Sequence, residues 1–125
     1  MSNPSDRSYT KDHEWALISG NSARVGITMF AQDALGDIVY VKLPEVGQEV
    51  GVGESIAEVE STKSVSDIYS PLTGKITAVN DSLDQAPELI NSSPYEDGWI
   101  FEIAFEGDGG ADTISAEEYE ELTRG

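Results

Sequence analysis

The chain has 125 residues, a length typical of one domain built around a single hydrophobic core. Its formal net charge of −17 disfavours binding to nucleic acid and to anionic membrane surfaces. It contains no cysteine, which excludes disulfides, thiolate catalysis and zinc–thiolate sites.

We expect one domain over residues 1–125, with a flexible tail at residues 1–8. The segments "WALIS" and "ARVGI" alternate in polarity and predict a β-hairpin with "GNS" as its turn. The next segment, "ITMFAQDALG", predicts a short helix instead. Thr28 can cap its first turn, and Gly36 can end it in a left-handed conformation.

A strand is predicted for "IVYVKL", with Ile38, Tyr40 and Lys42 on one face and the alternate residues on the other. Pro44 ends this strand because it has no backbone N–H to donate. The segments "SIAEVE" and "SVSDIYS" predict two further strands, which the polar turn "STKS" joins.

The last third of the chain adds the strands "GKITAVN" and "GWIFEIAF", separated by the turn-rich segment "NDSLDQAPELINSSPYEDG". The closing segment "SAEEYEEL" predicts a helix, in which Ser115 and Glu118 have capping-box spacing. Many short strands without long helical crossovers indicate a mainly β fold, either a small sandwich or a flattened barrel. Its helices are one short helix in the N-terminal third and one at the C-terminus.

The residues give little support for catalysis or for a metal site. His13 is the only histidine, and in an extended segment its neighbour Glu14 points to the opposite face, so the two do not form an acid–base pair. The segment "EGDGGAD" lacks the ligand spacing of a calcium loop. No segment has the length and apolarity of a membrane helix, and the N-terminus resembles no targeting sequence, so we expect a cytoplasmic protein.

Lys63 is the basic residue whose setting indicates a function. It occupies the apex of the "STKS" turn between two half-buried strands, where a modifying enzyme could reach its amine. The acidic residues Glu58, Glu60 and Asp67 nearby favour the charged amine, which makes Lys63 a poor nucleophile on its own. The position suits an amine that a dedicated enzyme acylates, although geometry alone also fits a lysine that only improves solubility.

The segment "ESTKSVSDIYSPLTGKI" resembles the attachment hairpin of lipoyl and biotinyl carrier domains. The segments "YTKDHEW", "GIT", "AQDALGDIVYVKLPEVG" and "NSSPYEDGW" resemble the H-protein family of the glycine cleavage system, in the same order and spacing. The resemblance covers the chain except for its terminal tails. It implies the barrel-sandwich hybrid fold of lipoyl domains.

The resemblance also implies a non-catalytic carrier with a lipoyl group in amide linkage on Lys63. A pyridoxal-phosphate glycine decarboxylase would load the aminomethyl group of glycine onto this arm. An aminomethyltransferase would pass the one-carbon unit to tetrahydrofolate, and a flavin-dependent dihydrolipoyl dehydrogenase would reoxidise the dithiol. A lipoyl-attaching enzyme is the fourth implied partner, while nucleic acid and membrane are not partners.

In this family the loaded arm folds into a surface cleft. The resemblance places Glu14 and Asp67 where they would pair with the amine, and Leu35 where it would pack along the arm. The chain departs from the family pattern in two places. It has Ala34 where some members have histidine, and Glu102 where lysine is common.

Other functions stay open at the level of sequence. Biotin carriers usually flank their lysine with methionines, whereas Thr62 and Ser64 flank Lys63 here. Lipoyl domains of 2-oxoacid dehydrogenases usually have an aspartate before the lysine. The remaining alternatives are a relay protein that passes lipoyl groups to other complexes and an interaction module without a lipoyl group.

Overall fold

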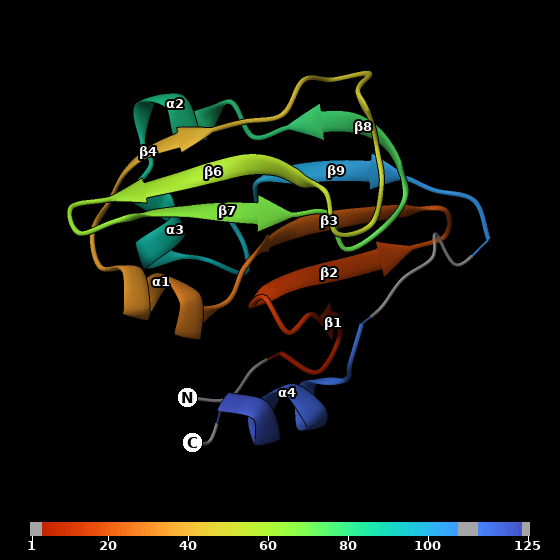
Figure 1. Cartoon of the computed structure of the whole chain (residues 1–125), viewed down its shortest axis with the longest axis horizontal. Coiled ribbons are helices and arrows are strands. Elements are labelled where there is room, and N and C mark those ends of the chain that lie inside the picture. Colours follow the sequence, from red (N-terminus) through yellow and green to blue (C-terminus); the bar gives the residue numbers. More distant parts are fainter. Residues whose placement is uncertain (1–3, 108–112, 124–125) are drawn as a thin grey trace.

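The computed structural model describes residues 4–107 and 113–123, and these residues form two antiparallel sheets (Figure 1). The larger sheet has the strand order β1-β2-β3-β9-β8-β5, and the smaller sheet has the order β4-β6-β7. The larger sheet comprises β1 (Ser8–Tyr9), β2 (Glu14–Ser19), β3 (Ser22–Ile27), β5 (Glu49–Val50), β8 (Gly74–Val79) and β9 (Phe101–Ala104). The smaller sheet comprises β4 (Ile38–Lys42), β6 (Ser55–Ser61) and β7 (Val65–Tyr69). This mainly β, sandwich-like arrangement confirms the predicted fold class.

The inner faces of the two sheets share one hydrophobic core. Val25 and Phe101 of the larger sheet belong to the same buried cluster as Val59 and Ile68 of the smaller sheet. Each such side chain stabilises the fold by about 1.5–3 kcal/mol relative to an exposed position. This shared core holds the smaller sheet in place, and the turn between β6 and β7 projects at one end of the molecule (Figure 1).

The predicted hairpins are confirmed. Strands β2 and β3 pair in register from Glu14↔Ile27 to Ser19↔Ser22, and Gly20 in their turn has φ +62°. Strands β6 and β7 pair from Ser55↔Tyr69 to Glu60↔Val65.

The predicted helix near the N-terminal third is α1 (Met29–Leu35). The Thr28 hydroxyl accepts a hydrogen bond from the Ala31 amide, and the Gly36 amide donates to the Gln32 carbonyl. Both predicted helix ends are therefore confirmed. The predicted left-handed helical conformation of Gly36 is wrong, since its φ is +85° but its ψ is −153°, and β4 begins only two residues later.

The predicted alternation in β4 is wrong at its start. A register shift between Ile38 and Tyr40 leaves Val39 exposed beside an exposed Tyr40, while Ile38 and Val41 are both buried. A bulge adds one residue to the strand, so the side chains beyond it change face. The sequence pattern could not show this, since a bulge depends on the partner strand β6.

The segment predicted as turns also contains two short helices, α2 (Ser82–Gln85) and α3 (Leu89–Ser92). Each buries one apolar side chain in the core, Leu83 in α2 and Ile90 in α3. Helices of a single turn have little intrinsic stability, so tertiary packing decides whether they form.

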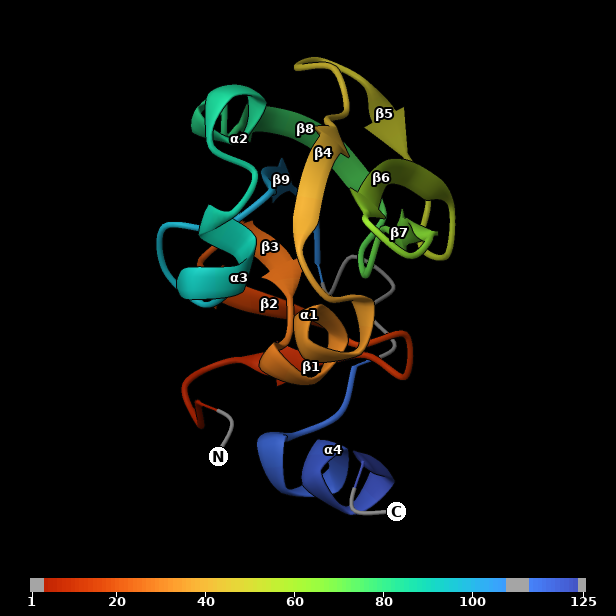
Figure 2. The same cartoon turned by 90° about the vertical axis from the view of Figure 1, so that its left-hand side faces the viewer.

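The predicted C-terminal helix is α4 (Ala116–Thr123). Its capping box is present, because the Glu118 amide donates to the Ser115 hydroxyl and the Ser115 amide donates to the Glu118 carboxylate, both at 3.2 Å. Figure 2 shows α4 beside β1, on the side of the molecule away from α2. Tyr119 holds it there, fully buried and stacked on the Tyr9 ring at 4.9 Å between centroids.

The expected tail at residues 1–8 overlaps the first strand, because Ser8 belongs to β1. The guanidinium of Arg7 donates to the Tyr95 carbonyl at 3.0 Å and lies 4.7 Å from the centroid of the Trp15 ring. Residues 1–3 lie outside the described residues.

Candidate functional site: the Lys63 turn

Lys63 lies at the exposed turn that connects β6 to β7, as predicted. The inward-facing residues Val59 and Ile68 anchor the two strands in the core, while the turn extends beyond it. The amine is therefore carried by a short hairpin with a buried base, at one end of the molecule (Figure 1).

Hydrogen bonds hold the turn itself. The Thr62 amide donates to the Asp37 carbonyl at 3.1 Å, which ties the turn to the segment between α1 and β4. The Lys63 and Ser64 amides both donate to the Ser61 hydroxyl at 3.1 Å, and the Ser61 amide donates to the Ser64 carbonyl at 2.8 Å. Because all these donors have partners, the backbone at Lys63 is fixed although its side chain is exposed.

The side chain of Lys63 passes beside Gly36, at the end of α1. A Cβ atom added to Gly36 would lie 3.2 Å from Lys63 Cε and 3.9 Å from Nζ. Leu35, which precedes Gly36, is half-buried and packs against the core. The absence of a side chain at Gly36 therefore leaves room for the lysine side chain along the helix end.

We expect Gly36→Ala to displace the Lys63 side chain and to lower the free energy of unfolding by about 1–3 kcal/mol, because Gly36 has a backbone conformation that other residues rarely adopt. Gly20→Ala is the matched control, since Gly20 also has positive φ but nothing lies within 4 Å of an added Cβ. Denaturant unfolding measures the stability of both variants, and NMR measures the chemical shifts of the Lys63 side chain. If the chemical shifts of the Lys63 side chain were the same in Gly36→Ala as in the wild type, the close contact between Lys63 and Gly36 would be contradicted.

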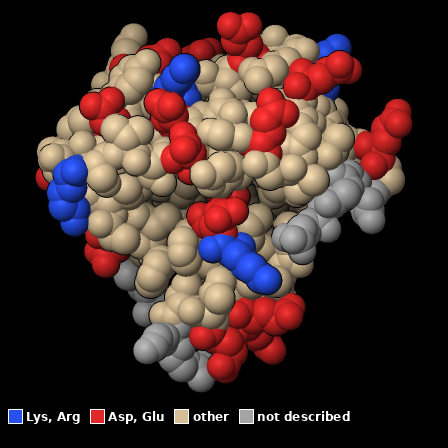
Figure 3. Space-filling model, viewed as in Figure 1, with Lys and Arg blue, Asp and Glu red and all other residues tan. Residues whose placement is uncertain are grey.

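Acidic and apolar side chains lie on the outer face of the smaller sheet, next to the turn. Two rows cross the sheet in register, the row nearer the turn being Tyr40, Glu60 and Val65, and the next row Lys42, Glu58 and Asp67. Asp67 is exposed in the second row. Figure 3 shows acidic side chains spread over this side of the molecule, with basic side chains in small separate groups. Any protein that approaches Lys63 across this face meets a negative potential.

Glu14 is buried rather than exposed, with 1% of its surface accessible. One carboxylate oxygen accepts a hydrogen bond from the Thr10 hydroxyl, and the other accepts one from the Tyr69 amide, both at 2.9 Å. Burial raises the pKa of Glu14 to about 7, and the nearby Asp12 charge adds to this, although the two hydrogen bonds act in the opposite direction. Glu14 therefore joins β2 of the larger sheet to β7 of the smaller one.

The structure thus places three of the four expected site residues at or beside β7. Lys63 precedes β7, Asp67 lies in its middle, and Glu14 bonds to its last residue, Tyr69. Leu35 lies at the other side of Lys63, next to Gly36. A group attached to Lys63 and folded back over the protein along β7 would pass Asp67 before it reached Tyr69 and Glu14.

His13 and Glu14 have separate partners, but the predicted extended conformation of His13 is wrong, because it lies in the turn before β2 with φ +68°. The Nδ1 atom of His13 lies 2.8 Å from the Tyr119 hydroxyl, and its ring packs against Phe30. Burial lowers the pKa of His13. In the described part of the chain, no group of three or more histidine, aspartate or glutamate residues is placed to hold a metal ion. Most of the segment "EGDGGAD" lies outside the described residues.

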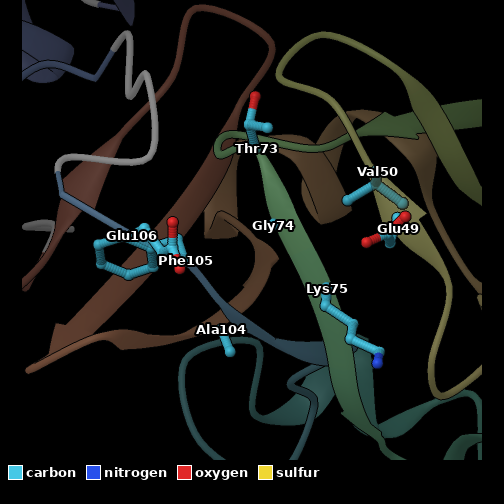
Figure 4. Close-up of a pocket in the computed structure, with 8 residues that line it drawn as sticks. All are labelled: Glu49, Val50, Thr73, Gly74, Lys75, Ala104, Phe105 and Glu106. Carbon is cyan, nitrogen blue, oxygen red and sulfur yellow. The ribbon is translucent and has the colours of Figure 1, made fainter.

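A surface hollow of about 790 Å³ lies away from Lys63. It opens where β8 starts and β9 ends, at the opposite end of the molecule from the β6–β7 turn (Figure 1). Figure 4 shows that its side chains do not converge on a common point, with Phe105 on one side and Lys75 and Glu49 on the other. None of the expected site residues lines it. No described helix has the length and apolar composition required to span a membrane.

Sequence reasoning missed two residues near Lys63. The closeness of Gly36 to the lysine side chain comes from packing between segments almost thirty positions apart, which no local pattern shows. Asn91 lies in the segment predicted as turn-rich, but its side chain bonds to Gly36 and to Ile38 at the start of β4. The motif "NSSPYEDGW" contained the residue but gave no indication of its partners.

Comparison with known proteins gives a consistent result over almost the whole chain. The family model described as glycine cleavage H-protein matches residues 7–124. A glycine cleavage system H protein of Beutenbergia cavernae is 50% identical over 125 residues, covering 100% of this chain and 99% of the relative. One from Thermus thermophilus is 54% identical over 123 residues, covering 98% and 96%.

The fold is also similar to a solved structure. The crystal structure of a glycine cleavage system H protein from Mycobacterium marinum matches with a TM-score of 0.89 at 43% sequence identity. The match covers 98% of this chain and 99% of that structure's chain. Sequence and fold therefore point to the same group of proteins.

Proposed function

The chain belongs to the glycine cleavage H-protein family and acts as a lipoyl carrier of that system, and we propose that Lys63 Nζ holds its lipoyl group in amide linkage. The observation that supports this assignment is the exposed position of Lys63 on a turn whose backbone amides are all hydrogen-bonded. A modifying enzyme can reach this amine, and the fixed backbone then sets where the attached arm begins.

The residues around Lys63 fit such a group. Gly36 leaves space beside the lysine stem, and the chain has no cysteine whose thiolate would exchange with a disulfide. When bound, the lipoyl group supplies a dithiolane that takes up the aminomethyl group left by glycine decarboxylation and later gives it up. The chain itself contributes a rigid anchor at Lys63 and a surface along β7.

We propose that the arm rests on a surface that includes Leu35 and Asp67, with the buried carboxylate of Glu14 behind it, bonded to the Tyr69 amide. Leu35 offers apolar contact beside Gly36, and Asp67 offers an exposed carboxylate on the strand that leads away from the turn. Both Glu14 oxygens already have hydrogen-bond partners, so Glu14 acts on an amine mainly through its charge. Because its pKa is raised to about 7, a nearby cation would favour the ionised form.

The partners in this proposal are a pyridoxal-phosphate glycine decarboxylase, a tetrahydrofolate-dependent aminomethyltransferase, a flavin-dependent dihydrolipoyl dehydrogenase and a lipoyl-attaching enzyme. A net charge of −17 supports steering toward basic surfaces on these proteins, which raises association rates at low salt. The chain takes no catalytic role in this scheme. The cytoplasmic location is part of the same proposal.

Intact-mass measurement followed by peptide mapping tests the attachment site. Protein produced with lipoate and a lipoyl-attaching enzyme should gain the mass of one lipoyl group, and the modified peptide should contain Lys63. The unmodified peptides that contain Lys42 and Lys75 serve as internal controls, since both lysines are also exposed. A protein that stays unmodified, or carries the group on another lysine, would refute the assignment and favour an interaction module without a lipoyl group.

A further inference from the structure

Asn91 connects α1, the residue that follows it and the first residue of β4 through its side chain. Its Nδ2 group donates to the Gln32 side-chain oxygen at 2.8 Å and to the Gly36 carbonyl at 2.9 Å. Its Oδ1 accepts from the Ile38 amide at 2.9 Å. The two backbone partners fix the orientation of the amide, because a carbonyl only accepts and an amide N–H only donates. Aspartate, which has the same size, could accept the hydrogen bond from the Ile38 amide but could not donate the other two, because it has no N–H.

The segment that Asn91 holds is the one against which the Lys63 turn packs. The carbonyl of Asp37, between the two backbone groups bonded to Asn91, accepts the Thr62 amide at 3.1 Å. Gly36 lies against the Lys63 side chain. Residue 38 also opens the pairing of β4 with β6. A continuous set of contacts therefore runs from Asn91 through residues 36–38 to residues 61–63.

We propose that Asn91 is a positioning residue for Lys63. It fixes residues 36–38, and through them it sets the direction in which the lysine side chain leaves the surface. Asn91 donates no hydrogen bond to Lys63 and takes no part in the chemistry of an attached group. The direction of the lysine side chain matters for carrier function only if the lipoyl group is attached to Lys63, as proposed above. The contacts that link Asn91 to the Lys63 turn do not depend on that proposal.

Asn80 provides a matched control elsewhere in the fold. Its Nδ2 group donates to the carbonyls of Asp97 and Trp99, both at 2.8 Å, and its Oδ1 accepts from the Ser82 amide at 3.3 Å. Asn80 thus donates two side-chain hydrogen bonds and accepts one, as Asn91 does, although both of its acceptors are backbone carbonyls. None of them reaches residues 36–38 or 61–64. Asn80→Ala therefore measures how much stability is lost when a hydrogen-bonded asparagine is removed away from the Lys63 turn.

Amide hydrogen exchange tests the mechanical link. In Asn91→Ala we expect the Thr62 amide to exchange about tenfold faster or more than in Asn80→Ala, compared under conditions of equal global stability. Asn91→Asp keeps size and the acceptor for the Ile38 amide but loses both donors, and it should also accelerate Thr62 exchange if the alanine variant does not fold. Equal acceleration in the Asn91 and Asn80 variants, or wild-type protection of Thr62 in both Asn91 variants, would overturn the proposal.

The rate of Lys63 modification by a lipoyl-attaching enzyme tests the consequence for function. We expect kcat/KM for Asn91→Ala to fall severalfold, with Asn80→Ala close to wild type. Equal rates in the two variants would overturn the positioning role. A wild-type protein that is never modified at Lys63 would instead refute the proposed function, and the exchange measurement would still decide the link between Asn91 and the turn.

Discussion

Lys63→Arg is expected to abolish carrier activity completely in a glycine cleavage system reconstituted from purified partner enzymes. Arginine keeps the positive charge and most of the stem, but its guanidinium does not lose a proton in proteins and so does not attack an activated acyl group. The turn should be undisturbed, because its hydrogen bonds involve the backbone of Lys63 and the hydroxyl of Ser61 rather than the amine. The measurement is glycine-dependent release of carbon dioxide and formation of the folate product.

Lys42→Arg and Lys75→Arg are the controls for this loss. Both lysines are exposed on strands, Lys42 on the same sheet as the turn and Lys75 on the larger sheet. Each substitution preserves charge in the same way as Lys63→Arg, so activity close to that of the wild type is expected. Turnover retained in Lys63→Arg would mean that the arm is attached elsewhere or that none is needed.

The β6–β7 hairpin shows how much of this site could be predicted from sequence. The alternation of Val59 and Ser61 with Glu58 and Glu60 was sufficient to place Lys63 at a turn, because a strand that buries one face imposes a period of two. The ends of α1 and the capping box of α4 were predictable for a similar reason, since local hydrogen bonds decide them.

Features that depend on distant segments could not be predicted in this way. The bulge at Val39 depends on the pairing of β4 with β6, and the helix α3 forms because Ile90 packs in the core. The link from Asn91 to Gly36 joins positions that only the fold brings together. The burial of Glu14 between two sheets was likewise hidden, because the sequence shows an acidic residue at the start of an ordinary strand.

Glu14→Gln is expected to remove a pH dependence of stability between about pH 4.5 and pH 7. In this interval the buried Glu14 of the folded protein keeps a proton that the unfolded chain has released, since burial raises its pKa from 4.5 to about 7. The folded state then binds more protons than the unfolded state, so the free energy of unfolding falls as pH rises. The loss is complete above pH 7 and amounts to on the order of 3 kcal/mol.

Glutamine removes the titrating group while it keeps one oxygen for the Tyr69 amide. We therefore expect Glu14→Gln to gain stability relative to wild type as pH rises from 5 to 8, even if the lost hydrogen bond at Thr10 costs about 1 kcal/mol at every pH. Denaturant unfolding of both proteins at pH 5, 6, 7 and 8 measures this difference. Asp67→Asn, which removes a negative charge from the exposed part of β7, controls for the change in net charge and should follow the wild type. A Glu14→Gln curve parallel to that of wild type would show that the folded protein already holds Glu14 ionised.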